Sequence, residues 1–196
     1  MSVQHWDLFP DMPRPPDVFP DGAGDPSGLQ DDCPIRNGKK RTHDEELFAS
    51  SVGPSLMHVT QSAYRAIMEY HLSHEPEVGG MLLGPADDEL ITHFIPDEGA
   101  TVTRASFTLD AAGLNRVLQQ FRGCRMNGKG LVHLHPSGMV RPSYRDVQYV
   151  AKTFANPKNQ AARQFFLPIV CDGRLHPYVL IRERQLRVLV AELVLI

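Results

Sequence analysis

The sequence lacks the features that mark exported, disulfide-stapled or membrane-spanning proteins. It has only three cysteines, Cys33, Cys124 and Cys171, and an odd number without a C-x-x-C pair argues against a disulfide framework. No uncharged stretch approaches eighteen apolar residues, and the first residues have neither a basic nor an apolar segment of the secretory kind. We therefore expect a soluble, non-exported protein in a reducing cytoplasm.

A strong charge of either sign is also lacking. The formal net charge is −3 over 196 residues, so electrostatics gives no reason to expect nucleic acid or an anionic membrane as a partner. Hydrophobic residues make up 42% and charged residues 22%, as in globular proteins. This length allows one domain of ordinary size with an appended segment.

The appended segment is predicted at the N-terminus, over residues 1–55. It contains eight of the sixteen prolines and ten acidic against five basic residues. Such a segment buries too little apolar surface to offset its ordering entropy, which predicts a disordered or loosely docked tail. The cluster of Trp6, Leu8 and Phe9 leaves a linear docking motif open as an alternative to a plain solvated tail. The folded domain is then expected over 56–196.

Periodicity and turn residues predict a mixture of strands and helices in that domain. Strands are expected at about 57–59, 81–85, 90–95, 101–109, 130–135, 165–171 and 175–181. Helices are expected at about 61–73, from Asp110 to Gly123, and at 143–155, with Asn127-Gly128 as a turn. The last residues, 186–196, fit a strand or a short amphipathic helix, and the pattern does not separate the two. The whole predicts a single α/β sheet domain with about three helices.

The most informative stretch is the apolar run that ends in His133 and His135. Two histidines at i and i+2 in a strand turn both imidazoles to the same face. Ten residues separate His135 from Asp146, which stands where a helix should begin. Two imidazoles and one carboxylate leave a fourth tetrahedral position free for water, the pattern of catalytic zinc.

These residues resemble the JAMM motif of the JAB/MPN zinc metalloprotease family. The likeness comprises His-x-His, ten residues and Asp, with Pro142-Ser143 before that Asp and an upstream Glu77-Val-Gly-Gly-Met-Leu-Leu-Gly. The run 107–110 leading into a helix is similar to the prokaryotic JAB subgroup. The resemblance covers about residues 56–182 and implies an α+β, MPN/cytidine-deaminase-like fold, a single mixed sheet flanked by about three helices.

The resemblance also implies a set of roles. His133, His135 and Asp146 would bind one Zn²⁺ per chain, with water as the fourth ligand. Glu77 would be the general base, and Ser143 would donate to the developing oxyanion. The implied reaction is hydrolysis of the amide bond after the C-terminus of a ubiquitin-like modifier. Its setting would be a bacterial conjugation or defence pathway, beside activating (E1-like) and conjugating (E2-like) enzymes.

One position departs from the family, which usually has Ser or Thr between the two histidines where this chain has Leu134. A strand should turn that side chain to the face opposite both imidazoles, so we expect a packing change and retained metal ligation. Glu75 is a nearby competitor of Glu77 for the role of base. A non-catalytic MPN-type scaffold and a zinc hydrolase of another amide substrate remain alternative functions.

The other histidines and cysteines have simpler structural interpretations. His71 and His74 form a pair at one helix end, for which no third metal ligand is identified. His93 and His176 are expected in strands, and no partner is identified for either. We expect Cys124 and Cys171 to pack as small hydrophobic residues, because no base for a cysteine nucleophile can be placed.

Overall fold

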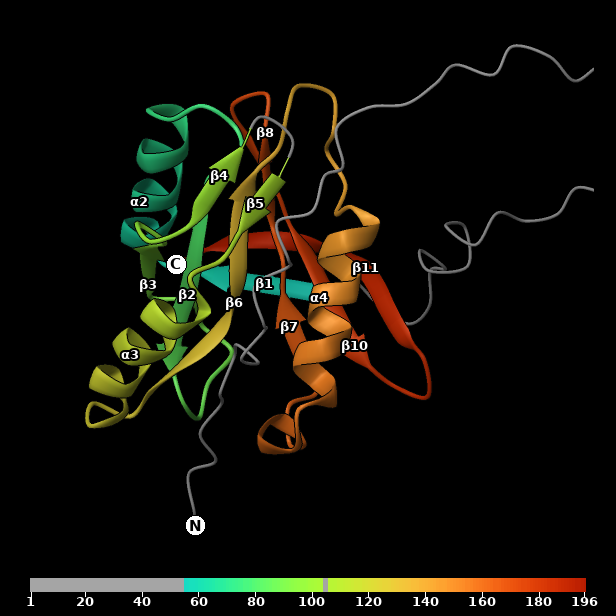
Figure 1. Cartoon of the computed structure of the whole chain (residues 1–196). Coiled ribbons are helices and arrows are strands. Elements are labelled where there is room, and N and C mark those ends of the chain that lie inside the picture. Colours follow the sequence, from blue (N-terminus) through green and yellow to red (C-terminus); the bar gives the residue numbers. More distant parts are fainter. Residues whose placement is uncertain (1–54, 104–105) are drawn as a thin grey trace, which may run out of the picture.

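The structure, a computed structural model, describes residues 55–103 and 106–196 (Figure 1). The predictions for the tail therefore lie outside the described residues. In chain order the elements are β1 Ser55–Val59, α2 Gln61–Leu72, β2 Gly79–Pro85, β3 His93–Pro96, β4 Thr101–Thr103, β5 Ser106–Thr108, α3 Ala111–Arg122, β6 Met126–Leu134, α4 Tyr144–Ala155, a 3-10 turn Pro157–Asn159, β7 Gln164–Phe166, β8 Ile169–Cys171, β9 Arg174–His176, β10 Tyr178–Arg182 and β11 Leu186–Leu195.

A nine-stranded mixed sheet forms the centre of the fold. Its main path runs β1-β11-β10-β7-β6-β2-β3, and β8 pairs with β6 and with β9 off this path. β6 pairs antiparallel with β2 and parallel with β7 and β8, whereas β1 pairs parallel with β11. The prediction of an α+β domain with a single mixed sheet and about three helices is confirmed.

Alternation along β6 divides the core between the two faces of the sheet. Leu131 packs with the apolar residues of α3 and α4, and Val132 and Leu134 pack with those of α2. The helices therefore cover opposite faces, α2 on one and α3 with α4 on the other (Figure 1). None of the helices in the described ranges is long and apolar enough to cross a bilayer.

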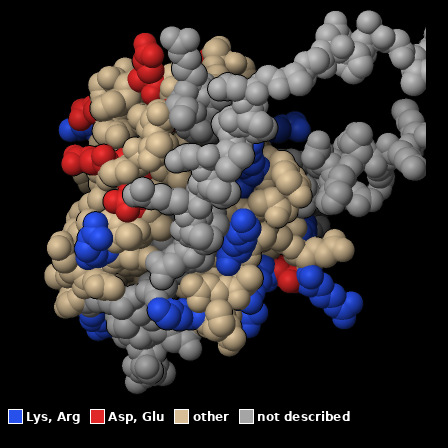
Figure 2. Space-filling view, in the orientation of Figure 1, with Lys and Arg blue, Asp and Glu red and all other residues tan. Residues whose placement is uncertain are grey.

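Charged side chains of both signs occupy the visible surface. Figure 2 shows acidic side chains mostly on the α2 side and basic ones mostly on the α4 side. Neither sign covers this face of the molecule.

The three helices begin where the sequence places a capping side chain. Thr60 accepts a hydrogen bond from the Ala63 amide at 3.2 Å, and Asp110 accepts one from the Gly113 amide at 2.9 Å. Ser143 caps α4 in the same manner. These side chains satisfy amides that have no partner in the first turn of a helix, which confirms the three predicted helix starts.

The prediction of one strand over 101–109 is wrong. The structure has two short strands there, β4 and β5, which pair only with each other. The sequence contains the reason: Val102 and Phe107 differ in parity, so one strand would turn them to opposite faces. In the observed register they lie directly opposite each other and share a face.

Two other local predictions need correction. Asn127-Gly128 does not form a turn but lies inside β6, where both residues pair with β2. The predicted hairpin over 165–171 and 175–181 is present but divided: β8 pairs with β9, while β7 pairs with β10. The two-residue loop of the first pair, Asp172-Gly173, has φ of 50° and 70°, as a type I′ turn requires. Residues 186–195 form a strand, which decides the alternative left open by the sequence.

Candidate metal centre

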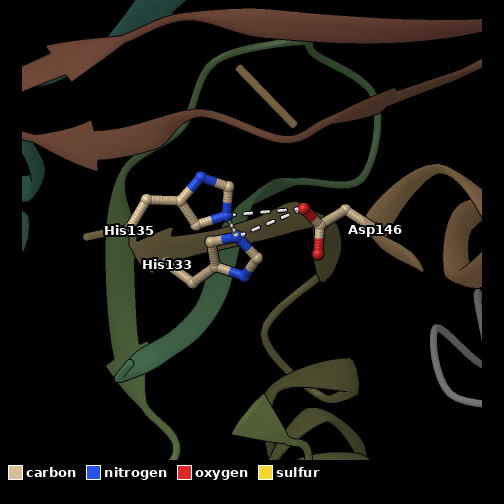
Figure 3. A group of neighbouring side chains, drawn as sticks. All are labelled: His133, His135 and Asp146. Atoms are coloured by element: carbon tan, nitrogen blue, oxygen red, sulfur yellow. Dashed lines mark hydrogen bonds and ion pairs between the residues drawn. The ribbon is translucent and has the colours of Figure 1, made fainter. Parts of the chain in front are cut away.

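Three side chains converge where β6 ends and α4 begins (Figure 3). Nε2 of His133 and Nε2 of His135 are 2.6 Å apart, and Oδ2 of Asp146 lies 3.6 Å from the first and 3.4 Å from the second. Both histidines are buried and Asp146 is partly buried. Among the described residues, these three side chains form a group that could hold a metal ion, because their ligand atoms all lie within 4.8 Å of one another.

The donor set fits a zinc ion. Bonds of about 2.0–2.2 Å to a tetrahedral Zn²⁺ place the ligand atoms about 3.3–3.6 Å apart. The two distances from Asp146 agree with this spacing, and the two imidazoles would separate by less than about 1 Å to reach it. Two nitrogens and one carboxylate oxygen are ligands that zinc accepts and leave one tetrahedral position for water or substrate.

A backbone carbonyl orients the second histidine. Nδ1 of His135 lies 2.8 Å from the carbonyl oxygen of Met139, which can only accept a hydrogen bond. The ring therefore carries its proton on Nδ1 when neutral, and its lone pair on Nε2 points at Asp146 and His133. This is the arrangement in which a histidine ligates a metal while its other nitrogen donates to a fixed oxygen.

The carboxylate is held by the start of its own helix. Oδ2 of Asp146 accepts the Ser143 amide at 2.6 Å, and the Asp146 amide donates to Oγ of Ser143 at 3.3 Å, which together form a capping box. Asp146 is the acidic residue of the first turn of α4, where the helix dipole favours negative charge. One structural device thus fixes the position of the ligand oxygen and keeps it ionised.

Electrostatics within the cluster favours ionised Asp146. Burial alone would raise the pKa of this carboxyl, but its interaction with the side chains of His133 and His135, at 3.6 and 3.4 Å, outweighs burial and brings the pKa far below its usual range. Burial likewise lowers the pKa of His135, and hydrogen bonds to Asp146 and to the Met139 carbonyl, with the nearby charge of Glu77, raise it above its ordinary value. The three groups therefore attract positive charge to the point where they meet.

Glu77 lies two residues before β2, the strand that pairs with the histidine strand β6. Gly79, two residues further on, pairs with His133, and the Val78 carbonyl accepts the Leu134 amide at 2.8 Å. Glu77 is partly buried and its charge acts on His135, whereas Glu75 is exposed. This placement favours Glu77 as the carboxylate beside the cluster, and its role as base stays a prediction.

The helix-end histidines do not form a second metal site. Nδ1 of His71 lies 2.7 Å from the Ile67 carbonyl, and Nδ1 of His74 lies 2.7 Å from the Tyr70 carbonyl. Each Nδ1 is thus engaged with the backbone one turn earlier in its own helix, and in the described residues neither histidine belongs to a group of three possible metal ligands. This agrees with the structural interpretation of the pair.

The remaining candidates divide between confirmation and correction. His93 is exposed, and its Nδ1 lies 2.8 Å from the hydroxyl of Thr92. Cys171 is buried as expected, but Cys124 is exposed, so its prediction as a packed residue is wrong. It follows the last turn of α3, where the chain leaves the core for the tight connection to β6.

Leu134 lies where the strand alternation predicts. Its side chain is buried in the apolar cluster on the α2 face, while the two histidines point to Asp146 on the other side of the sheet. The departure from the family motif therefore changes the packing under α2.

Sequence reasoning missed two neighbours of the cluster. The ring of Phe107, from β5, meets that of His133 edge-on with centroids 6.1 Å apart. The Met139 carbonyl orients His135, as described above. The Pro-Ser-Gly sequence before Met139 predicts a tight turn. That the carbonyl of Met139 meets the ring of His135 depends on the fold and has no signal in the sequence.

Fold and site together define an α+β domain with a candidate metal centre of two histidines and one aspartate. No known family model matches the chain, and no curated protein matches it. The chain is similar to the solution structure of protein DSY2949 from Desulfitobacterium hafniense, with 15% identity and a TM-score of 0.53, over 72% of this chain and 92% of that one. It is also similar to the crystal structure of AF2198, a JAB1/MPN domain protein from Archaeoglobus fulgidus, with 20% identity and a TM-score of 0.39, over 72% and 100%. The first likeness concerns the fold alone.

Proposed function

We propose that this chain is a zinc-dependent metallopeptidase of the JAMM type that hydrolyses the amide or isopeptide bond after the C-terminus of a ubiquitin-like modifier. The observation that carries the proposal is the convergence of Nε2 of His133, Nε2 of His135 and Oδ2 of Asp146. A non-catalytic scaffold has no need to keep a complete ligand set. The substrate class rests on the resemblance of the motif.

The proposed roles come from the resemblance of the motif, and the positions of the residues support them. His133, His135 and Asp146 would hold the ion, and bound zinc supplies Lewis-acid chemistry that acidifies water and polarises the scissile carbonyl. Glu77, beside the cluster on the β2 side, takes a proton from the attacking water and delivers it to the leaving amine. Ser143, which adjoins Asp146, turns its hydroxyl proton toward the oxygen on which negative charge develops.

The proposed setting is a cytoplasmic, bacterial modifier pathway. The partners would be a ubiquitin-like protein or its conjugates, together with activating (E1-like) and conjugating (E2-like) enzymes. A neighbouring gene for a small protein with a modifier-like C-terminus would support this setting and provide the substrate for assays.

Metal analysis of the purified full chain tests the ligand set. We expect about one zinc per wild-type chain and loss of the metal in Asp146→Ala, because the carboxylate is one of three protein ligands. Asp87→Ala is the matched control. Asp87 is exposed, and it follows the end of β2 opposite to the one that pairs with His133, so this variant should keep its zinc. A wild type without zinc would overturn the proposal.

A pair of glutamate variants tests the base. Glu77→Gln should keep zinc and lose hydrolysis of a ubiquitin-like protein carrying a fluorogenic C-terminal amide, because an amide cannot take a proton from water. Glu75→Gln should keep both. Loss of activity in Glu75→Gln with full activity in Glu77→Gln would reverse the assignment. Zinc content without turnover on any ubiquitin-like fusion would favour the scaffold, and turnover only on other amides would favour a different zinc hydrolase.

A further inference from the structure

The loop that follows the second histidine is a tight turn whose last carbonyl orients that histidine. The Met139 amide donates to the Pro136 carbonyl at 3.1 Å, and Gly138 has φ of 81°, as the third position of a type II turn requires. The Met139 carbonyl then accepts from Nδ1 of His135 at 2.8 Å. The position of this turn therefore sets the direction in which Nε2 of His135 points.

A second turn, distant in sequence, holds the first one in place. Oδ2 of Asp172 accepts the Gly138 amide at 3.1 Å, and the same carboxylate accepts a hydrogen bond from the side chain of Ser137. The Cys171 thiol lies 3.3 Å from the Pro136 carbonyl oxygen and 3.4 Å from Oδ2 of Asp172, and it can donate to either. Two consecutive residues at the tip of one hairpin thus contact three consecutive residues of the turn after His135.

The hairpin that carries Asp172 is itself fastened to the histidine strand. β8 pairs with β6 at His133 and Leu134, and the His135 amide donates to the Val170 carbonyl at 2.9 Å. The type I′ loop between β8 and β9 then fixes the backbone of Asp172 at φ of 50°. A continuous path of hydrogen bonds leads from the β8–β9 loop, through the turn 136–139, to Nδ1 of His135.

We propose that Asp172 is a positioning residue of the metal centre: its carboxylate fixes the turn 136–139 and, through the Met139 carbonyl, holds His135 in the tautomer and orientation that ligate the ion. Asp172 does not act on substrate or metal directly. The inference rests on the proposed metal centre and adds to it a residue outside the JAMM motif. The Asp172 carboxyl remains ionised near neutral pH, because its hydrogen bonds to Ser137 and Gly138 lower its pKa.

The size of the effect follows from the number of links between Asp172 and the ion. Loss of a group that bonds directly to a ligating histidine typically lowers metal affinity about 10–100-fold. Asp172 acts through one further link and is exposed to water, so we expect a loss of about tenfold, the lower end of that range.

Two substitutions separate the hydrogen bond from the backbone conformation. Glycine and asparagine both tolerate φ near 50°, so neither Asp172→Gly nor Asp172→Asn should strain the hairpin loop. Asparagine keeps a side-chain oxygen that can accept the Gly138 amide, and glycine removes it. Asp87→Gly, at the far end of β2, is the control for removal of an exposed aspartate.

Two measurements on the full chain test the proposal. The first is the Kd for Zn²⁺, from competition with a chromophoric chelator. The second is the ¹⁵N chemical shifts of the His135 ring nitrogens in metal-free protein, which distinguish the two neutral tautomers. We expect Asp172→Asn and Asp87→Gly to match the wild type, with the proton on Nδ1. Asp172→Gly should show mixed tautomers and about tenfold weaker Zn²⁺ binding.

The outcomes separate this proposal from the proposed function. An Asp172→Gly variant with the wild-type tautomer and Kd would overturn the role of Asp172. Equal losses in Asp172→Gly and Asp172→Asn would also overturn it, because the charge would then matter in place of the hydrogen bond. A wild type that binds no Zn²⁺ overturns the metal centre, and the tautomer in metal-free protein still decides whether Asp172 orients His135.

Discussion

Gly79 is not a ligand of the candidate metal centre, but its substitution by alanine should weaken metal binding. A Cβ atom at Gly79 would lie 2.6 Å from the Val132 carbonyl oxygen and 2.7 Å from Cβ of His133. Both contacts are much shorter than the separation of about 3.5–4.0 Å at which such atoms attract each other. The Val132 oxygen belongs to the backbone and Cβ of His133 is bonded directly to it, so neither atom can move by a side-chain rotation. Gly79→Ala must therefore displace the strand that carries His133.

The neighbouring glycine provides a control with similar strain and a different partner. A Cβ atom at Gly80 would meet the Ile95 carbonyl oxygen and lie 2.6 Å from Cε2 of Phe94, both from β3. Overpacking of this kind costs about 1–3 kcal/mol. Replacing glycine by alanine also lowers the conformational entropy of the unfolded chain, which stabilises the fold by only about 0.4–1 kcal/mol. Both variants should therefore be less stable than the wild type.

Only Gly79→Ala should weaken metal binding. We expect it to bind Zn²⁺ about tenfold more weakly, a loss of about 1.4 kcal/mol, because His133 leaves its position. Gly80→Ala should bind Zn²⁺ as the wild type does. Urea unfolding of metal-free protein gives the stabilities, and competition with a chromophoric chelator gives the affinities. Unchanged affinity in Gly79→Ala, or equal losses in both variants, would refute the coupling between β2 and the ligand strand.

Three further predictions concern pH, capping and packing. Burial lowers the pKa of His71 to about 4 from 6.5, so the unfolded chain is protonated first and the free energy of unfolding falls by up to about 3 kcal/mol as pH drops from 6.5 to 4. Urea unfolding of His71→Phe should therefore depend less on pH, and equal slopes would contradict this. Ser143→Ala should lose about 1 kcal/mol in thermal unfolding and Ser143→Thr much less, because the hydroxyl caps α4; equal stability of the two would exclude the cap. Leu134→Thr should cost about 2 kcal/mol or more in urea unfolding yet leave the Kd for Zn²⁺ unchanged, and weaker binding would contradict its separation from the ion.

The elements nearest the cluster were the most predictable from sequence. The apolar run before His133, the cap at Ser143 and the apolar positions of α4 are local signals, and each agrees with the structure. The spacing of two in a strand is enough to place His133 and His135 on one face. Their meeting with Asp146 was expected from the motif, and the structure brings the three groups together.

Other features depend on contacts that no local pattern contains. β4 and β5 form their backbone hydrogen bonds with each other. The odd spacing between Val102 and Phe107 predicts two strands only when the pairing of one with the other is considered. Asn127-Gly128 has the composition of a turn, but pairing with β2 keeps it extended. The bond between Asp172 and Gly138 joins two turns whose relation depends on the parallel pairing of β8 with β6.

The division of β6 into two faces bears on where substrate selectivity lies. Leu134, the position that departs from the family motif, is buried against the residues of α2, so its side chain cannot reach a substrate bound at the ion. Phe107 meets His133 edge-on from the face that carries the ligands, and Met139 and Tyr144, whose side chains are exposed, stand next to residues that hold His135 and Asp146. Residue 134 can therefore act on substrate only through the position of the strand, whereas these three side chains can act by contact. Under the proposed function, the determinants of substrate selectivity should be sought first in β5 and in the two segments that flank the cluster.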